Sequence, residues 1–118
     1  MYKFNFEKLE VWKKSKSFTK SVYEISNSFP EDERFGLISQ LRRSAVSVCS
    51  NLAEGSSRLS AKDQKHFYNM AYSSLMESFN QILISYDLGF MSEENLELSR
   101  NEVHIISLMI NNLRKSTN

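Results

Sequence analysis

The chain contains very few residues that interrupt a helix, and this feature constrains its fold more than any other. Its 118 residues include one proline, Pro30, and three glycines, Gly36, Gly55 and Gly89. Proline and glycine are the strongest local breakers of regular structure, so these positions divide the chain into a few long pieces. No piece shows the alternation of apolar and polar residues that is typical of a half-buried strand. Long helices are therefore predicted.

The apolar residues inside each piece recur at steps of three, four and seven, which places them on one face of a helix. This spacing predicts helices over about residues 7–28, 33–55, 61–88 and 93–115. In chain order, the apolar faces are Val11, Phe18, Val22, Ile25 and Phe29; Leu37, Leu41, Ala45, Val48 and Leu52; Tyr68, Tyr72, Leu75, Phe79, Ile82, Tyr86 and Phe90; and Leu96, Val103, Ile106, Ile110 and Leu113.

Residues that start and stop helices stand at these boundaries. Pro30 disfavours a helical conformation at the residue before it, and the acidic residues 31–33 suit the positive N-terminal end of the second helix. Ser60 precedes Asp63 by three residues and resembles a capping box, and Ser92 can cap the fourth helix. Gly89 is a suitable residue to end the third helix.

Four amphipathic helices joined by short loops bury their apolar faces most simply as an antiparallel up-down-up-down four-helix bundle, so the predicted fold class is all-α. Without a repeat or a low-complexity linker, residues 1–118 are expected to form a single domain. The helix over 61–88 is apolar over an unusually wide arc, which favours contact with a second copy of the chain. The residues outside its main face are Met70, Ala71, Met76, Leu83 and Ile84.

The sequence also indicates where the protein resides. Its single cysteine cannot form an internal disulfide, and its first residues lack the apolar stretch of a signal peptide. No segment approaches the ~20 apolar residues that span a membrane. We therefore expect a cytoplasmic protein without a membrane partner.

Residues with catalytic or metal-binding chemistry are present but do not form a recognisable motif. Bundles that hold two metal ions need two Glu-x-x-His pairs and two further glutamates, whereas this chain has only Asp63-x-x-His66, and His104 lies without such a pair. Cys49 comes directly after Val48 of the apolar face of the helix over 33–55, where a cysteine behaves as a small hydrophobic residue. No nucleotide-binding loop or nucleophile elbow occurs. The expectation is a protein that is not an enzyme, with no metal and no cofactor.

Charge is unevenly distributed, although the net charge is only +1. Cations gather in the first half of the chain, and the second half offsets them with Glu93, Glu94, Glu97 and Glu102. A local basic surface attracts phosphates even when net charge is small, so these cations are candidates for binding RNA or DNA. The alternative is that they are merely solvated, as most exposed lysines are. The candidates are Lys13, Lys16, Lys20, Arg43, Arg58, Lys62 and Lys65.

Arg42 differs from its neighbour Arg43, because helical spacing places Arg42 at the border of the apolar face and Arg43 on a polar stripe. A border arginine either meets an acid from another helix or subunit, such as Glu77, or extends to water. Glu54 lies too far along the same helix to reach it. We expect Arg42, Glu54 and Glu77 to belong to a structural polar network.

Two segments of the chain resemble a known family. They are Phe29-Pro30-x-x-Glu33-x-x-Gly36-Leu37-x-x-Gln40-x-Arg42-Arg43-x-Ala45 and Asn51-Leu52-Ala53-Glu54-Gly55-x-x-Arg58. With Glu77, they are similar to the four-helix bundle proteins first noticed in intervening sequences of bacterial 23S rRNA genes. The chain departs from that pattern at Ser73-Ser74, where the family usually has Gly-Ser, which predicts a looser helix contact, and at Cys49.

This resemblance implies an antiparallel four-helix bundle that forms pentameric rings, while the family's activity is not settled. A more distantly similar bundle, the accessory variability determinant of diversity-generating retroelements, forms a basic pentamer that binds nucleic acid. The sequence thus supports a homo-oligomeric bundle that binds RNA or DNA, as an accessory to a protein partner. The alternative hypothesis is a structural or protein-interaction module with no nucleic-acid role.

Overall fold

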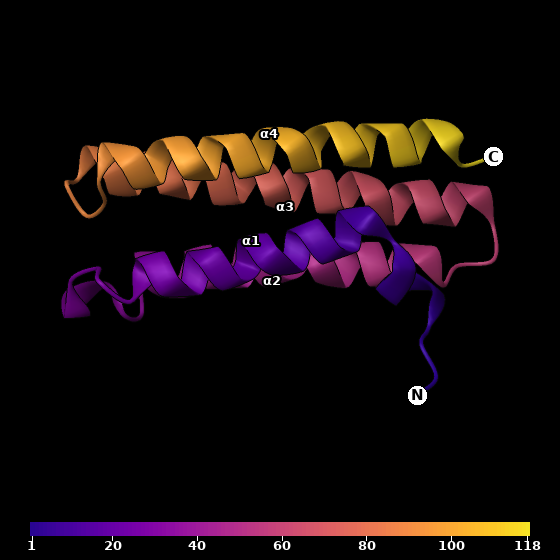
Figure 1. The fold of residues 1–118 in the computed structure, drawn as a ribbon, viewed down its shortest axis with the longest axis horizontal. Coiled ribbons are helices and arrows are strands. Elements are labelled where there is room, and N and C mark those ends of the chain that lie inside the picture. Colours follow the sequence, from indigo (N-terminus) through magenta and orange to yellow (C-terminus); the bar gives the residue numbers. More distant parts are fainter.

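The computed structural model describes residues 1–118 and contains four α-helices, which confirms the predicted all-α class. They are α1 (Glu10–Ser26), α2 (Leu37–Ser56), α3 (Ala61–Asp87) and α4 (Glu93–Ser116). The helices lie side by side in an antiparallel bundle, with both chain ends at the same end as the turn between α2 and α3 (Figure 1). Each helix packs on the next one in sequence, and α4 closes the bundle against α1.

The predicted apolar faces form the core. Seventeen apolar residues are buried in one cluster, among them Phe18 of α1, Leu52 of α2, Leu75 of α3 and Ile110 of α4, each with no exposed surface. Burying a large aliphatic or aromatic side chain contributes about 1.5–3 kcal/mol, so these contacts hold the four helices together. None of the helices is long and apolar enough to cross a membrane.

The start of α2 differs from the prediction. Residues 31–33 form a separate 3-10 turn, η2 (Glu31–Glu33), and the α-helix begins only at Leu37. Gly36 separates η2 from α2 because its backbone, at φ −109° and ψ −110°, is not helical. Glu33 still serves the helix, since its carboxylate accepts a hydrogen bond from the Leu37 amide at 3.2 Å.

The first helix is also shorter than predicted. It begins at Glu10, and the residues before it form a 3-10 turn, η1 (Asn5–Lys8), that packs against α1 and α2. The Phe4 amide donates to the Glu7 carboxylate at 2.8 Å, which stabilises this turn.

The predicted caps of the later helices are confirmed. The Ser60 hydroxyl accepts a hydrogen bond from the Asp63 amide, and the Ser92 hydroxyl accepts one from the Asn95 amide, both at 3.1 Å. Gly89 ends α3 with φ +81°, in the left-handed region where a side chain is strained.

One residue assigned to the outer face of α3 belongs to the core. Ala71 is fully buried, because α3 contacts both α2 and α4 and so buries a wider arc than one apolar stripe. Met70, Met76 and Ile84 are exposed, each with about 40% of its surface accessible to solvent. Gly55 marks a close approach of α2 to α3, since an added Cβ would lie 2.6 Å from the ring of Tyr68.

Candidate nucleic-acid interface

The seven candidate cations are all exposed, and the structure divides them into separate groups. Lys13, Lys16 and Lys20 lie on α1 and are called the α1 lysines below. Lys13 is 3.2 Å from the carboxylate of Glu10, and the Lys16 ammonium lies 4.8 Å from the centre of the Trp12 ring. Two of the three α1 lysines therefore already have a partner within the same chain.

The second group lies around the turn between α2 and α3. Arg58 lies in this turn, and Lys62 and Lys65 belong to the first turns of α3; the three are called the turn cations below. The Arg58 guanidinium stacks 4.5 Å from the centre of the Phe67 ring and lies 3.6 Å from the Glu54 carboxylate. Lys62 and Lys65 take part in none of the chain's three ion pairs.

Arg43 lies apart from both groups, in the middle of α2. At the rise of an α-helix, the 15 residues that separate it from Arg58 correspond to about 22 Å. It lines a polar hollow between α2 and α3, and a second hollow continues from the first through Ser47, which lines both. We call the two together the α2–α3 groove. Its lining residues are Gln40, Arg43, Ser44, Ser47, Asn51, His66, Asn69, Met70, Ser73, Ser74 and Glu77.

A buried chain of hydrogen bonds forms the floor of this groove. The Ser78 hydroxyl donates to Ser44 at 2.8 Å, and the Ser44 hydroxyl donates to the side-chain oxygen of Gln81 at 2.8 Å. The Gln81 amide nitrogen then donates to the Glu77 carboxylate at 3.3 Å. Ser44, Ser78 and Gln81 are each at most 5% exposed, so this chain links the interior to an exposed carboxylate.

Of these residues, sequence reasoning identified Glu77 but not Ser44, Ser78 or Gln81. The signal was present, because Ser44, Ser47 and Asn51 follow helical steps on α2, and Ser74, Ser78 and Gln81 do so on α3. Two matching polar stripes indicate helices that meet through polar side chains, but a pattern within one helix does not show which other helix it faces.

At Ser74 the third helix contacts the second directly, while a looser contact than in the family pattern stays a prediction. The Ser74 hydroxyl lies 2.8 Å from that of Ser47, and the Asn51 amide donates to the Ser47 hydroxyl at 3.1 Å. Ser73, which stands where the family usually has glycine, is exposed and lines the second hollow.

Within one chain, the predicted network of Arg42, Glu54 and Glu77 consists of separate local contacts. Arg42 meets no carboxylate and instead binds the C-terminal end of α1, donating to the Ser26 hydroxyl at 2.8 Å and the Asn27 side chain at 3.0 Å. Glu54 pairs with the arginine of the turn cations, one helical turn further on, and Glu77 faces the groove. Opposite charges do not meet here because Arg42 faces α1 while Glu77 faces α2.

The cysteine and the histidines occupy unrelated places. Burial raises the pKa of the Cys49 thiol above its ordinary value, outweighing the opposing effects of the Thr19 hydroxyl and Lys16. His66 lines the groove, whereas His104 is exposed on α4. No group of three or more His, Cys, Asp or Glu side chains is placed to hold a metal ion.

The fold and the groove define a small all-α four-helix bundle with a polar surface between two neighbouring helices. Over residues 7–112, the chain matches the sequence profile of the 23S rRNA-intervening sequence protein family. The chain therefore belongs to this family, as its motifs indicated.

A crystal structure with the same fold comes from the S23 ribosomal protein family of Bacteroides thetaiotaomicron, and that protein is described as having unknown function. The TM-score is 0.80 at 21% sequence identity, with 90% of this chain and 99% of the other covered. At this identity the likeness establishes the fold alone. No curated protein sequence matches the chain significantly.

Proposed function

We propose that this protein is a non-enzymatic, cytoplasmic, homo-oligomeric bundle that binds RNA or DNA without a cofactor. The observation that carries the proposal is that Lys65 directly precedes the groove residue His66 in the first turns of α3, while Arg43 lines the groove further along. Phosphates of a nucleic-acid strand are bound by lysine and arginine, and a polar groove beside them offers hydrogen-bonding groups to the rest of the strand.

Homo-oligomerisation is supported by apolar side chains that the single chain leaves exposed. On α4, Leu98, Ile105 and Leu108 are each about half exposed, in addition to the exposed methionines and isoleucine of α3. Large apolar side chains gathered on outer helix faces favour an interface. A pentamer is the assembly that the family resemblance implies, and it would repeat the basic surface around a ring.

The apolar row on α4 also supports the second candidate, a protein-interaction module with no nucleic-acid role. The two functions differ in their response to salt. Phosphate binding releases counterions and weakens steeply as salt rises, whereas apolar association does not.

The test is a fluorescence-anisotropy titration of short RNA and DNA strands at about 50 mM and about 200 mM salt. We compare the parent protein with two triple variants of equal charge change, in which either the turn cations or the α1 lysines become glutamate. The turn-cation variant is expected to lose binding and to show a flatter salt dependence, by roughly one unit of log–log slope per lost contact.

The α1 variant serves as the matched control and is expected to lose less affinity. Absence of binding by the parent at low salt would reject the nucleic-acid role, and the protein-interaction module would become the better account of the chain. Equal binding by the parent and the turn-cation variant would reject the turn cations as the phosphate-binding surface.

A further inference from the structure

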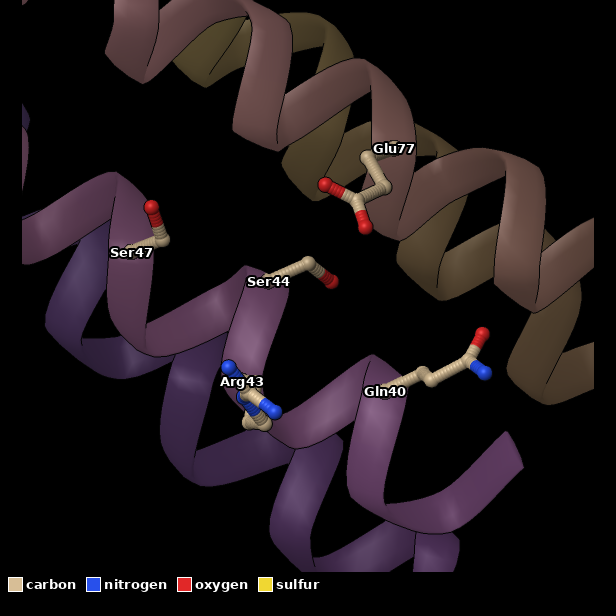
Figure 2. A pocket seen from close by; sticks show the side chains of 5 residues that line it. All are labelled: Gln40, Arg43, Ser44, Ser47 and Glu77. Carbon is tan, nitrogen blue, oxygen red and sulfur yellow. The ribbon is translucent and has the colours of Figure 1, made fainter. Parts of the chain in front are cut away.

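The hollow around Arg43 has an unusual set of charges. It has a volume of about 320 Å³ and is lined only by polar residues, with Gln40 and Arg43 on α2 and Glu77 on α3. In Figure 2, the Glu77 side chain extends from α3 toward the gap between the helices, across from Ser44. Neither Arg43 nor Glu77 belongs to any of the chain's ion pairs. The hollow therefore offers one free guanidinium and one free carboxylate.

The Glu77 carboxylate is held in place by a hydrogen bond from a buried side chain. Gln81 is 5% exposed and donates to Glu77, while its own side-chain oxygen accepts from the buried hydroxyl of Ser44. Rotation of the Gln81 side chain would break its hydrogen bond from the Ser44 hydroxyl and leave the buried Gln81 oxygen without this donor, which is unfavourable. Glu77 is thus a hydrogen-bond acceptor with a supported position, which is what recognition of a ligand requires.

The charges restrict what can bind. A phosphate would be attracted by Arg43 but repelled by Glu77, so the hollow suits a neutral ligand with donors on one edge and acceptors on another. Among nucleobases, guanine has this arrangement: N1–H and the N2 amino group are adjacent donors for a carboxylate, and O6 and N7 are acceptors for an arginine. Adenine, cytosine and uracil lack two adjacent donors of this kind. We propose that Arg43 and Glu77 bind an unpaired guanine base between α2 and α3.

This inference rests on the proposed function and deepens it. The turn cations bind phosphates without regard to sequence, and the hollow adds base recognition further along the same groove. Guanine also occurs in free nucleotides, so the experiment includes a mononucleotide.

The probes are single-stranded RNAs of about 12 nucleotides, a length within the range of single-strand binding sites. One is all uridine, one has a single central guanosine, and one has inosine at that position, which lacks the N2 amino group. Fluorescence anisotropy at low salt measures their affinities. The guanosine probe is expected to bind about tenfold more tightly than the uridine probe, and inosine to lose most of that gain. Calorimetric titration with guanosine and adenosine monophosphate tests the free nucleotide.

Two variants and a control assign the effect to the hollow. Glu77→Gln keeps the shape of the side chain but replaces one acceptor with a donor. Arg43→Lys keeps the charge but loses the bidentate hydrogen bond that a guanidinium can donate to guanine. Both are expected to bind the guanosine and uridine probes equally while retaining uridine affinity. Glu94→Gln, on the exposed start of α4, makes the same chemical change away from the groove and is expected to preserve the preference for guanosine.

The outcomes separate the two proposals. Equal binding of all three probes by the parent, with no preference for guanosine monophosphate, overturns guanine recognition but leaves nucleic-acid binding intact. Failure to bind any RNA rejects the proposed function. Guanine recognition then stands only if guanosine monophosphate binds and Glu77→Gln abolishes that binding. It is rejected if the mononucleotide does not bind.

Discussion

Two buried serines differ in whether their hydroxyls have hydrogen-bond partners. The Ser15 hydroxyl on α1 is fully buried and has no partner, whereas Ser44 on α2 joins Ser78 to Gln81. A buried polar group without a partner lowers stability, and one that completes a chain of hydrogen bonds supports it. The same residue type therefore acts in opposite directions in this bundle.

Replacing each serine with alanine tests this difference. Ser15→Ala removes an unpaired hydroxyl and is expected to raise the free energy of unfolding by about 1 kcal/mol. Ser44→Ala leaves the Gln81 oxygen without its donor and is expected to lower that free energy by about 1–3 kcal/mol. Thermal unfolding at one fixed protein concentration measures both. A loss of stability in Ser15→Ala would show that its hydroxyl does find a partner.

Arg42 and Glu54 lie in the two segments that resemble the family but differ in their contacts. Arg42→Ala removes charged hydrogen bonds to the end of α1 and a contact 4.5 Å from the Tyr23 ring, so a loss of about 1.5–3 kcal/mol is expected. Glu54→Ala removes only an exposed pair, whose contribution is about 0–1 kcal/mol. Urea unfolding midpoints check the order. A larger loss in Glu54→Ala would place Glu54 in an interface between subunits.

At the scale of elements, each pair of neighbouring helices has its own kind of contact. The α2–α3 pair combines a close approach at Gly55 with the buried serines and glutamine, whereas α1 and α4 meet through Glu102, whose carboxylate accepts a hydrogen bond from Ser21 at 3.3 Å. Burial raises the pKa of Glu102 above its ordinary value, and the hydrogen bond from Ser21 opposes this only in part. The α1–α4 contact therefore responds to pH.

The direction of this response follows from proton binding. Because the pKa of Glu102 is higher in the folded state, the folded protein binds more protons between the ordinary value of 4.5 and the raised value. This carboxyl thus makes the protein less stable as pH rises through that window. Glu102→Gln is expected to raise the melting temperature at neutral pH and to flatten its dependence on pH above 4.5. Melting curves across this pH range measure it, and an unchanged slope would contradict the assignment.

At the scale of the whole molecule, one chain measures 43 × 28 × 23 Å and leaves apolar side chains exposed on α3 and α4. A homo-oligomer would cover them. Light scattering at micromolar concentration is expected to give a mass several times 13.8 kDa, and five times that mass if the ring is pentameric. A stable monomer would contradict the assembly.

A charge on the outer face of α3 tests where the copies meet. Ile84 is 41% exposed, and Ile84→Glu is expected to dissociate the oligomer while leaving helicity largely intact, because the monomer core is unchanged. Ser28→Glu adds the same charge at an exposed polar residue beyond the end of α1, away from the outer face of α3, and is the control. Light scattering and circular dichroism compare the two. An oligomer that stays intact in Ile84→Glu would exclude this face as the interface.

The sequence by itself determined the four helices, most of their core residues and the caps at Ser60, Ser92 and Gly89. These features depend on spacing within one helix and on hydrogen bonds between residues about three apart, so local order is enough to predict them. The late start of α2 escaped prediction because it depends on the backbone that Gly36 adopts.

Only the tertiary structure decided which polar side chains meet. Whether Arg42 faces Glu77 or the end of α1, and whether Ser44 reaches Gln81, depends on the rotation and axial offset of one helix against another. A helical pattern shows which residues share a face but not which residue of another helix lies opposite. The division of the seven cations into the α1 lysines, the turn cations and Arg43 follows for the same reason, because closeness in sequence does not set distance across a bundle.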